Sequence, residues 1–315
     1  MAPALSTPLF SAFPCELRFL IRMLSRRSFL QLVGASLAAT ALRPTFSLLA
    51  SANGDVYQGR ALSALPIYAS RSVTTEPIAQ LWPDSITSIL DSDDEWYQVP
   101  NGWVRRDGLQ PMLPYNTRDY QFINAVPFWA EVAAPVAPVR AFCAADAPLV
   151  TRIGHGGVSQ VIDALPGEPD GWYGIADQNG DLLGWTQGVF WRPVEAEFVG
   201  GDDHTLHIDR KQGLMRAYVG TKPILEIPFS AGSGLQTGDF TARRGAIGGL
   251  KLYADKQYEG VSWQTLFGDG QMITGIYWHN RFGQAVEGGA AVQTTPLLAR
   301  WLYGWLGDDA HISVE

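Results

Sequence analysis

The stretch YWHNRFGQAVEGGAAVQTTPLLARWLYGW, residues 277–305, joins an aromatic cluster, a run rich in Gly and Ala, and a helical pattern. Thr295 can cap a helix, Pro296 fits a first helical turn, and Gly307 can end one. Between these signals the large apolar residues repeat at helical spacing: Leu298, Trp301, Leu302 and Trp305. The sequence therefore predicts a closing helix that begins near Pro296 and ends at Gly307.

Upstream of this stretch the pattern is that of β-strands. Residues 204–234 read HTLHIDRKQGLMRAYVGTKPILEIPFSAGSG, in which TLHID, LMRAYV and ILEIPFS alternate between apolar and polar residues. Gly213 and the sequence GTKP separate these runs and are typical of turns. A meander of strands is therefore expected before the closing helix.

The order of these segments resembles one bacterial family. FSAGSG is followed by TARRGAIGGLKLY, then by ITGIYWHNRFG, a Gly-rich turn and the helix LARWLYGW. This order is similar to the L,D-transpeptidase (YkuD-type) domain of cell-wall enzymes, over residues 199–315. The resemblance implies a β-sandwich with a C-terminal helix. It also implies a site at which a cysteine takes an acyl group from a peptidoglycan stem peptide and passes it to an amine.

The residues that this chemistry requires are replaced. In the family a His-Gly pair precedes the aromatic segment, and Ser-His-Gly-Cys-x-Asn or Arg follows it. Here Thr274 stands at the first histidine, Glu287 at the serine and Gly288 at the second histidine. Ala290 stands at the cysteine and Val292 at the Asn or Arg. A thiolate nucleophile needs a nearby base and donors for the oxyanion. No catalytic residue is therefore expected at these positions.

The remaining framework suggests a binding role. The spacing of the motif and its glycine, Gly289, are retained. The candidate ligand-binding residues are Tyr277, Trp278, His279, Glu287 and Gly289. One alternative stays open, in which His279 and Glu287 form a new acid-base pair of a hydrolase, because a carboxylate beside a histidine is a common catalytic arrangement. A packing role for His279 is the favoured interpretation. No metal site and no cofactor are predicted.

Two earlier stretches resemble each other. Each leads to a hairpin whose strands carry Trp and a Gly-Trp pair: DDEWYQVPNGWVRRDGLQPM in the first and DGWYGIADQNGDLLGWTQGVFWRPV in the second. The Asn-Gly dipeptides in these hairpins are strong turn signals. Both stretches resemble bacterial SH3-like domains. The predicted boundaries are residues 53–113 for the first domain, 114–137 for a Pro- and Ala-rich linker, and 138–196 for the second domain.

The N-terminal region reads as an export signal. MLSRRSFLQLVGASLAATAL, residues 23–42, places Arg26 and Arg27 ahead of a short, Ala-rich apolar stretch, as in twin-arginine signals. A stable membrane span needs about 20 strongly apolar residues, which this stretch lacks. Residues 1–52 are assigned to the signal region, with Met23 as a possible true start and cleavage before Asn53. The protein is expected to be exported to the cell envelope or the exterior.

Cysteine content and charge narrow the function further. Cys15 and Cys143 are the only cysteines, and Cys15 precedes the signal, so the exported chain keeps one thiol. Cys143 has no neighbouring His or Lys in the sequence that would activate it. The net charge of −8 without a basic stripe argues against a nucleic acid partner.

The sequence as a whole predicts a mainly β protein, with two small SH3-like barrels followed by a YkuD-like β-sandwich domain and its C-terminal helix. The first functional hypothesis is a non-catalytic protein that binds peptidoglycan, its stem peptides or an envelope protein. The second is an active transpeptidase or hydrolase, and the third is a structural assembly protein.

Overall fold

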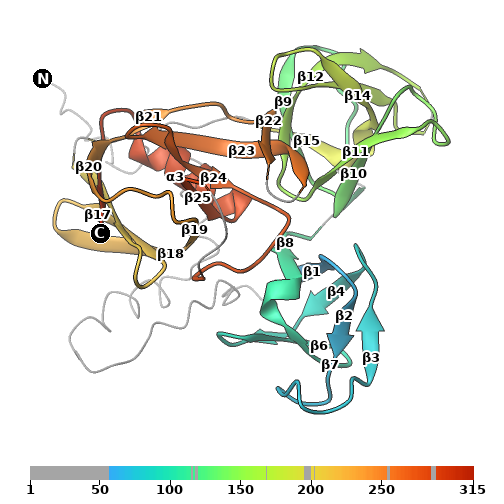
Figure 1. The fold of residues 1–315 in the computed structure, drawn as a ribbon. Coiled ribbons are helices and arrows are strands. Elements are labelled where there is room, and N and C mark those ends of the chain that lie inside the picture. Colours follow the sequence, from blue (N-terminus) through green and yellow to red (C-terminus); the bar gives the residue numbers. More distant parts are fainter. Residues whose placement is uncertain are drawn as a thin grey trace, which may run out of the picture.

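The computed structural model of the chain is mainly β, and its described part ends in a single α-helix and a last short strand (Figure 1). The mainly β fold with a C-terminal helix is thus confirmed. The predicted export signal lies outside the described residues. The structure describes residues 57–114, 116–117, 120–167, 169–194, 200–201, 203–253, 256–284 and 289–315.

The first unit, residues 57–112, consists of short strands. They form three small sheets with the orders β4-β1-β8, β2-β3 and β5-β6-β7 around one apolar core. A short 3-10 helix, η2 (Arg106–Gly108), precedes the last strand. The strands are β1 (Tyr57–Ala61), β2 (Leu65–Ile67), β3 (Ala79–Leu81), β4 (Ile86–Ile89), β5 (Asp91–Ser92), β6 (Trp96–Val99), β7 (Gly102–Arg105) and β8 (Leu109–Met112).

The second unit, residues 128–193, is one seven-stranded sheet with the order β11-β10-β14-β13-β12-β9-β15. Here too a 3-10 helix, η4 (Gly188–Phe190), precedes the last strand. The strands are β9 (Phe128–Val132), β10 (Val136–Arg140), β11 (Leu149–Gly154), β12 (Val158–Leu165), β13 (Trp172–Ala176), β14 (Leu182–Gln187) and β15 (Trp191–Pro193).

One predicted boundary needs correction. The sequence analysis gave residues 114–137 to a linker, but Phe128–Val132 forms β9 inside the seven-stranded sheet. It pairs with β12 and with β15, so that Val158 lies opposite Glu131. The second unit therefore begins before residue 138, because its sheet needs β9 to join its last strand to the rest.

A tight contact explains one glycine of the first unit. Gly102 begins β7 with a φ of 146°, a value that favours glycine. A Cβ at this position would collide with the backbone oxygen of Tyr68. Tyr68 and Trp103 exchange two backbone hydrogen bonds of 2.8 Å beside it. The Asn-Gly turn predicted from the sequence thus also allows two strands to approach closely.

The third unit, residues 204–314, holds two sheets and α3 (Pro296–Leu306). One sheet has the order β18-β17-β16-β26-β20, and the other has β19-β25-β24-β23-β21 with β22 paired to β23. The strands are β16 (His204–Asp209), β17 (Leu214–Val219), β18 (Lys222–Pro228), β19 (Ser230–Ala231), β20 (Gly238–Thr241), β21 (Arg243–Arg244), β22 (Leu250–Tyr253), β23 (Gln257–Phe267), β24 (Gln271–Gly275), β25 (Ala291–Thr294) and β26 (His311–Val314).

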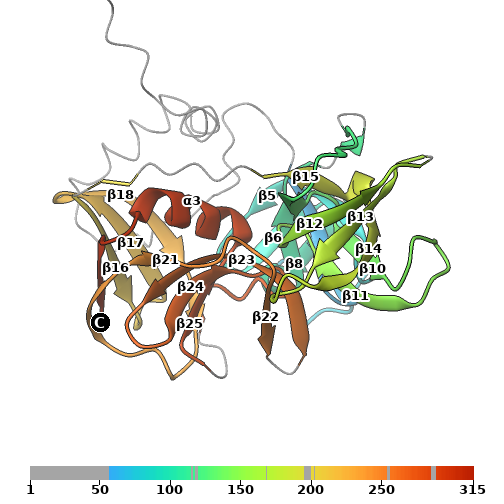
Figure 2. The ribbon, with the colours of Figure 1, turned by 90° about the horizontal axis from the view of Figure 1, so that it is seen from above.

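Helix α3 lies across the strands β23 and β24 (Figure 2). Its N-cap is Thr295, whose Oγ1 accepts a hydrogen bond of 3.3 Å from the backbone N–H of Leu298. Pro296 is its first residue, and Gly307 follows its end with a φ of 71°. The predicted capping residues are confirmed. The buried face of α3 shares one apolar core with both sheets, including Leu206, Ile227, Ile273, Val292 and Leu302.

Candidate functional site

Strands β24 and β25 run parallel. Thr274 and Val292, two of the positions predicted to have lost a catalytic side chain, lie on these strands. Thr274 pairs with Gln293 across these strands and is fully buried. Its Oγ1 donates a hydrogen bond of 2.8 Å to the backbone oxygen of Ser262 on β23. Thr274 therefore serves the sheet and presents no group to solvent.

The described remainder of the degenerate motif is Gly289, Ala290 and Val292. Glu287 and Gly288 lie outside the described residues. Gly289 is exposed with a φ of 73°, and Ala290, just before β25, is partly exposed. Val292 is fully buried in the core that both sheets share. These three positions offer a short backbone turn, a methyl group and a core side chain, and none of them supplies a nucleophile or a base.

A second segment lies against this turn. The backbone N–H of Gly234 donates a hydrogen bond of 3.1 Å to the carbonyl oxygen of Gly289. Four residues earlier, Ser230 donates its hydroxyl hydrogen to the carbonyl oxygen of Arg281, at 2.6 Å. The backbones of Arg281 and Gly289 therefore contact opposite ends of the SAGSG segment, residues 230–234.

The thiol of the described chain is elsewhere. Cys143 lies in the loop between β10 and β11 of the second unit and is a free, partly exposed cysteine. Partial burial and the nearby Asp163 carboxylate both raise the pKa of the Cys143 thiol. The protonated thiol is a poor nucleophile. Cys143 is therefore unsuited to replace the cysteine that position 290 lacks.

His279 has both ring nitrogens in hydrogen bonds. Nδ1 accepts from the backbone N–H of Arg281 at 3.2 Å, so the ring proton sits on Nε2. Nε2 then donates to Oε1 of Gln293 at 2.9 Å. Burial lowers the pKa of His279, and the Arg281 charge adds to this, while the bond to Gln293 opposes it. The ring is thus held neutral, with its lone pair already in use.

The two aromatic candidates pack beside Tyr258, with Trp278 stacked on its ring and Tyr277 edge-to-face with it. Trp278 is partly buried and lies parallel to Tyr258, with ring centroids 4.0 Å apart and planes 10° apart. Tyr277 is 4% exposed and donates its hydroxyl hydrogen to the carbonyl oxygen of Glu259 at 2.7 Å. Burial raises the pKa of the Tyr277 phenol. Tyr277 belongs to the core of the second unit, which leaves it no free surface for a ligand.

The segment after β24 also holds the three units together. Arg60 of β1 is buried and donates to the backbone oxygens of Pro135, at 2.8 Å, and Tyr277, at 3.0 Å. Asn280 is buried as well, and its Nδ2 lies 3.0 Å from the backbone oxygens of both Arg106 and Leu109. Figure 1 shows the first and second units meeting the third at this place. Residues 277–280 are therefore a three-unit junction.

The sequence did not indicate roles for Arg60 and Asn280 at the junction or for Gln293 beside His279. Arg60 lies 217 residues from Tyr277 in the chain, so no local pattern could connect them. Asn280 and Gln293 do lie inside the quoted stretch, one beside His279 and one after Val292. The available signal was that both residues carry side-chain amides, which can donate and accept hydrogen bonds close to the candidate His279.

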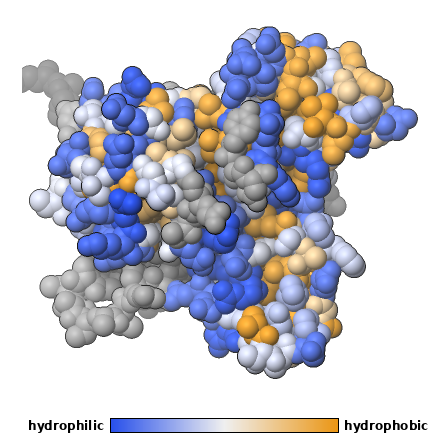
Figure 3. All heavy atoms as spheres, viewed as in Figure 1, coloured by the Kyte–Doolittle hydropathy of each residue, from blue (hydrophilic) through white to orange (hydrophobic). Residues whose placement is uncertain are grey.

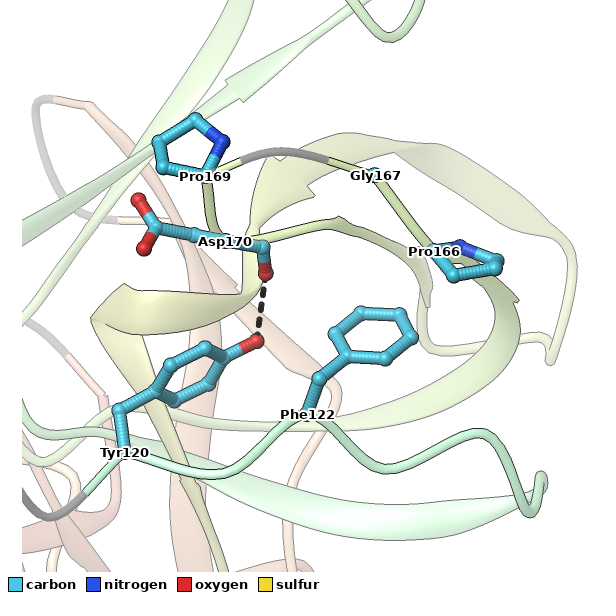
Figure 4. Close-up of a pocket in the computed structure, with 6 residues that line it drawn as sticks. All are labelled: Tyr120, Phe122, Pro166, Gly167, Pro169 and Asp170. Atoms are coloured by element: carbon cyan, nitrogen blue, oxygen red, sulfur yellow. Dashed lines mark hydrogen bonds between the residues drawn. The ribbon is translucent and has the colours of Figure 1, made fainter.

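Two cavities in the described part both lie against the second unit and away from Ala290. The wider one is a groove of about 430 Å³ between Tyr120, Phe122 and the turn at Pro166 and Gly167 (Figure 4). The Tyr120 hydroxyl donates to the backbone oxygen of Asp170 at 2.6 Å, and the Asp170 carboxylate points away from the Phe122 ring. The described residues that line the groove are mainly rings and prolines, together with Gly167 and Asp170.

The outer surface adds little to this picture. Figure 3 shows hydrophobic side chains gathering on the second unit, whose half-exposed apolar residues include Phe142, Leu149, Val150, Leu165 and Leu182. Within the described ranges, no three side chains from His, Cys, Asp and Glu gather so as to hold a metal ion. Among the same residues, no helix has the length and apolar character needed to cross a membrane.

Comparison with known proteins gives structural likenesses only. No protein-family model and no curated protein match the chain. An L,D-transpeptidase from Mycobacterium smegmatis matches 42% of this chain and 65% of its own, at 15% identity and a TM-score of 0.31. One from Mycobacterium tuberculosis matches 62% and 92%, at 12% identity and a TM-score of 0.32.

A third such structure, from Xylanimonas cellulosilytica, matches 39% of this chain and 64% of its own, at 14% identity and a TM-score of 0.29. This chain thus spans less than two thirds of the length of the Mycobacterium smegmatis and Xylanimonas cellulosilytica proteins. None of these likenesses assigns an activity to this chain, since one fold can serve many functions.

Proposed function

We propose that the chain is an exported, non-catalytic relative of L,D-transpeptidases that binds peptidoglycan. One observation carries the proposal. Ala290, which stands where the resemblance expects the nucleophilic cysteine, lies at a surface turn, and Val292 beside it is sealed in the core. The described residues here form a turn and a strand, and none of them carries a side chain for acyl transfer.

The state of His279 supports the same conclusion. A general base must have a lone pair within reach of the proton that it removes. The Nδ1 lone pair of His279 accepts a hydrogen bond from the backbone N–H of Arg281, and the Nε2–H group donates one to Gln293. An acid-base role with Glu287 would first have to break one of these bonds. The hydrolase alternative is therefore the less favoured function.

The proposed architecture follows the sequence. Residues 57–112 and 128–193 would be the two SH3-like domains, since each places a hairpin and a 3-10 helix before its last strand. The twin-arginine signal would export the folded chain, and cleavage before Asn53 would release it. Such domains would give the protein further contacts with wall material.

The proposed binding surface lies beside the turn at Gly289 and Ala290. Arg281 would supply an exposed cation to this surface, since its backbone contacts the start of the SAGSG segment and Gly289 contacts the end. Stem peptides carry carboxylates, which a guanidinium binds well. His279 would help to position this surface through the backbone N–H of Arg281. Tyr277 would act only through packing.

The test is co-sedimentation of the full chain with purified peptidoglycan at low and moderate salt, followed by analysis of the muropeptides. Binding with unchanged muropeptides is expected. Arg281→Glu should weaken binding about tenfold, which corresponds to one charge-assisted hydrogen bond. The matched control is Arg243→Glu, since Arg243 on β21 is equally an exposed arginine and should not matter. Absence of sedimentation would refute the ligand, and altered muropeptides would refute the lack of catalysis.

A further inference from the structure

A second, smaller cavity has a different character from the groove at Phe122. It encloses about 200 Å³ between the segment that follows the first unit and one side of the second unit. Tyr120 stands between the two cavities and lines both. The other residues that matter to the argument are Pro114, Asn116, His155, Trp191 and Arg192.

His155 presents an unused acceptor in this cavity. The side chain is more than nine-tenths buried at the turn between β11 and β12. Its Nδ1 lies 3.0 Å from the carbonyl oxygen of Ala133 and 3.3 Å from that of Ala134. Both neighbours are acceptors, so Nδ1 carries the proton and Nε2 has the lone pair. Among the described residues Nε2 has no hydrogen-bond partner, although the ring lines the cavity.

The His155 imidazole stays neutral near pH 7, so its Nε2 lone pair remains free to accept a hydrogen bond. Burial lowers the pKa of His155 to about 4, with the Glu131 charge opposing the shift and the Arg192 charge adding to it. Nε2 is not among the sealed polar atoms without a partner, which agrees with a lone pair that is open to the cavity. A ligand that supplies an N–H or O–H at this point would make a hydrogen bond with it.

Arg192 supplies a positioned cation in the same cavity. Its Nε and Nη2 lie 3.3 and 3.1 Å from Oε2 of Glu131, which is itself buried on β9. Arg300 of α3 approaches the same carboxylate oxygen at 3.7 Å. The Arg192 side chain is still 40% exposed, and its Nη1 takes no part in the pair with Glu131. The ion pair therefore fixes the guanidinium while one end stays available.

The apolar wall comes mainly from rings. Trp191 donates its indole N–H to the Thr186 hydroxyl at 3.1 Å, so it can offer the cavity only its apolar ring surface. Pro114 and Tyr120 face the cavity from the other side. Among the described residues that line it, the cavity thus joins the His155 acceptor, the Arg192 cation, the polar Asn116 and a small apolar wall, and a few polar groups in an apolar lining are usual for a small-molecule site.

We propose that this cavity binds a carboxylate of amino-acid size that carries an N–H donor next to it. The carboxylate would accept a hydrogen bond from Nη1 of Arg192, and the N–H group of the ligand would donate one to Nε2 of His155. A fully deprotonated phosphate or sulfate fits less well, because it has no hydrogen for the His155 lone pair. A single imidazole also falls short of the ligands that a metal requires. The proposal stands independently of peptidoglycan binding at Ala290.

Two sources share this chemistry, namely a free amino acid and the C-terminal residue of a peptide. The experiment uses the full chain with 15N-labelled histidine and follows the imidazole nitrogens by NMR. The probes are free alanine, N-acetylalanine, and N-acetylalanine amide, which lacks the carboxylate. A saturable shift of the His155 Nε2 signal with either carboxylate, and none with the amide, is expected. Preference for N-acetylalanine would identify a peptide terminus, and preference for alanine a free amino acid.

Arg192→Gln is the variant that tests the cation. It should weaken binding roughly tenfold or more, as expected for loss of one charge-assisted contact. Arg152→Gln is the matched control, because Arg152 is a half-exposed arginine of the same unit that pairs with Asp84 outside the cavity. Equal binding of the amide, equal affinity of Arg192→Gln and the unchanged protein, or no saturable shift at millimolar probe would each overturn the proposal.

Discussion

Two short segments of the third unit, residues 277–280 and 289–292, differ in how the rest of the molecule uses them. In the first, Tyr277, His279 and Asn280 all make hydrogen bonds, and two of these side chains reach elements outside β24 and β25. In the second, Gly289 and Ala290 contribute a turn, and Val292 fills the core. The first segment thus connects the third unit to the other two, whereas the described residues of the second supply a turn and part of the core of the third.

The strongest way to break the junction is Arg60→Ala. It leaves the backbone oxygens of Pro135 and Tyr277 without their donor and opens space in a buried site. The expected loss in unfolding free energy is about 3 kcal/mol. Urea unfolding followed by tryptophan fluorescence measures this loss, and loss of the junction should also separate the transition into two steps.

Arg71→Ala provides the comparison for Arg60. Arg71 pairs with Asp93 at 2.9 Å but is half-exposed, so its removal should cost about 1 kcal/mol or less. If both variants lost the same small amount of stability, the contacts of Arg60 would not be what couples the units.

The second segment is tested by restoring residues that the family carries. Val292→Asn places an amide in a fully buried core position and should cost about 2 to 3 kcal/mol. Ala290→Cys, at a partly exposed position two residues earlier, should change stability by less than about 0.5 kcal/mol. Thermal and urea unfolding compare the two, and an unaffected Val292→Asn would show that this strand position is not closed.

Close packing at the junction can be tested with glycines. A Cβ at Gly154 would overlap the Tyr277 ring and lie 2.5 Å from Nη1 of Arg60, so Gly154→Ala should cost about 1 to 2 kcal/mol. Gly167→Ala, in the same unit, meets no atom within 4 Å and should be neutral or slightly stabilising. Equal melting temperatures for the two variants would contradict the packing described around Tyr277.

The smallest effect concerns the titration of His279. Because its pKa is lowered in the folded state, the unfolded chain takes up the proton first as pH falls. Its contribution to stability is therefore complete above the ordinary value of 6.5 and declines as pH falls from there toward the folded pKa. Gln293→Leu should lower this pKa further, since Oε1 of Gln293 accepts the Nε2 hydrogen. Histidine NMR titration, assigned with His279→Asn, would show an unchanged pKa if the bond were absent.

Local signals predicted the helix, the three strands of the meander and the two Trp-bearing hairpins. Thr295, Pro296 and Gly307 act within a few residues, and the structure places all three as expected. Strand β9 escaped prediction because Phe128–Val132 is followed by a Pro- and Ala-rich run, and its identity depends on pairing with β12 and β15. The junction escaped for the same reason, since Arg60 and Tyr277 meet only in the folded chain.

The residue identities at the candidate site follow from the sequence, but the surroundings of these residues do not. The absence of a nucleophile at Ala290 could be read from sequence, since it depends only on residue identity. The burial of Tyr277 and the engaged state of His279 could not, because both arise from contacts with the other units or with β25. Glu287 remains a prediction.

The proposed lack of catalysis is tested most directly by incubating the full chain with muropeptides and an acceptor amine. The Ala290→Cys variant is treated in the same way, and mass spectrometry measures the products. An active L,D-transpeptidase serves as the positive control. No cross-linked product and no cleaved stem peptide are expected from either protein. The unchanged chain has neither a thiol at position 290 nor a base beside it, and the variant regains only the thiol. A cross-link or a cleaved stem from either protein would contradict the proposed lack of catalysis.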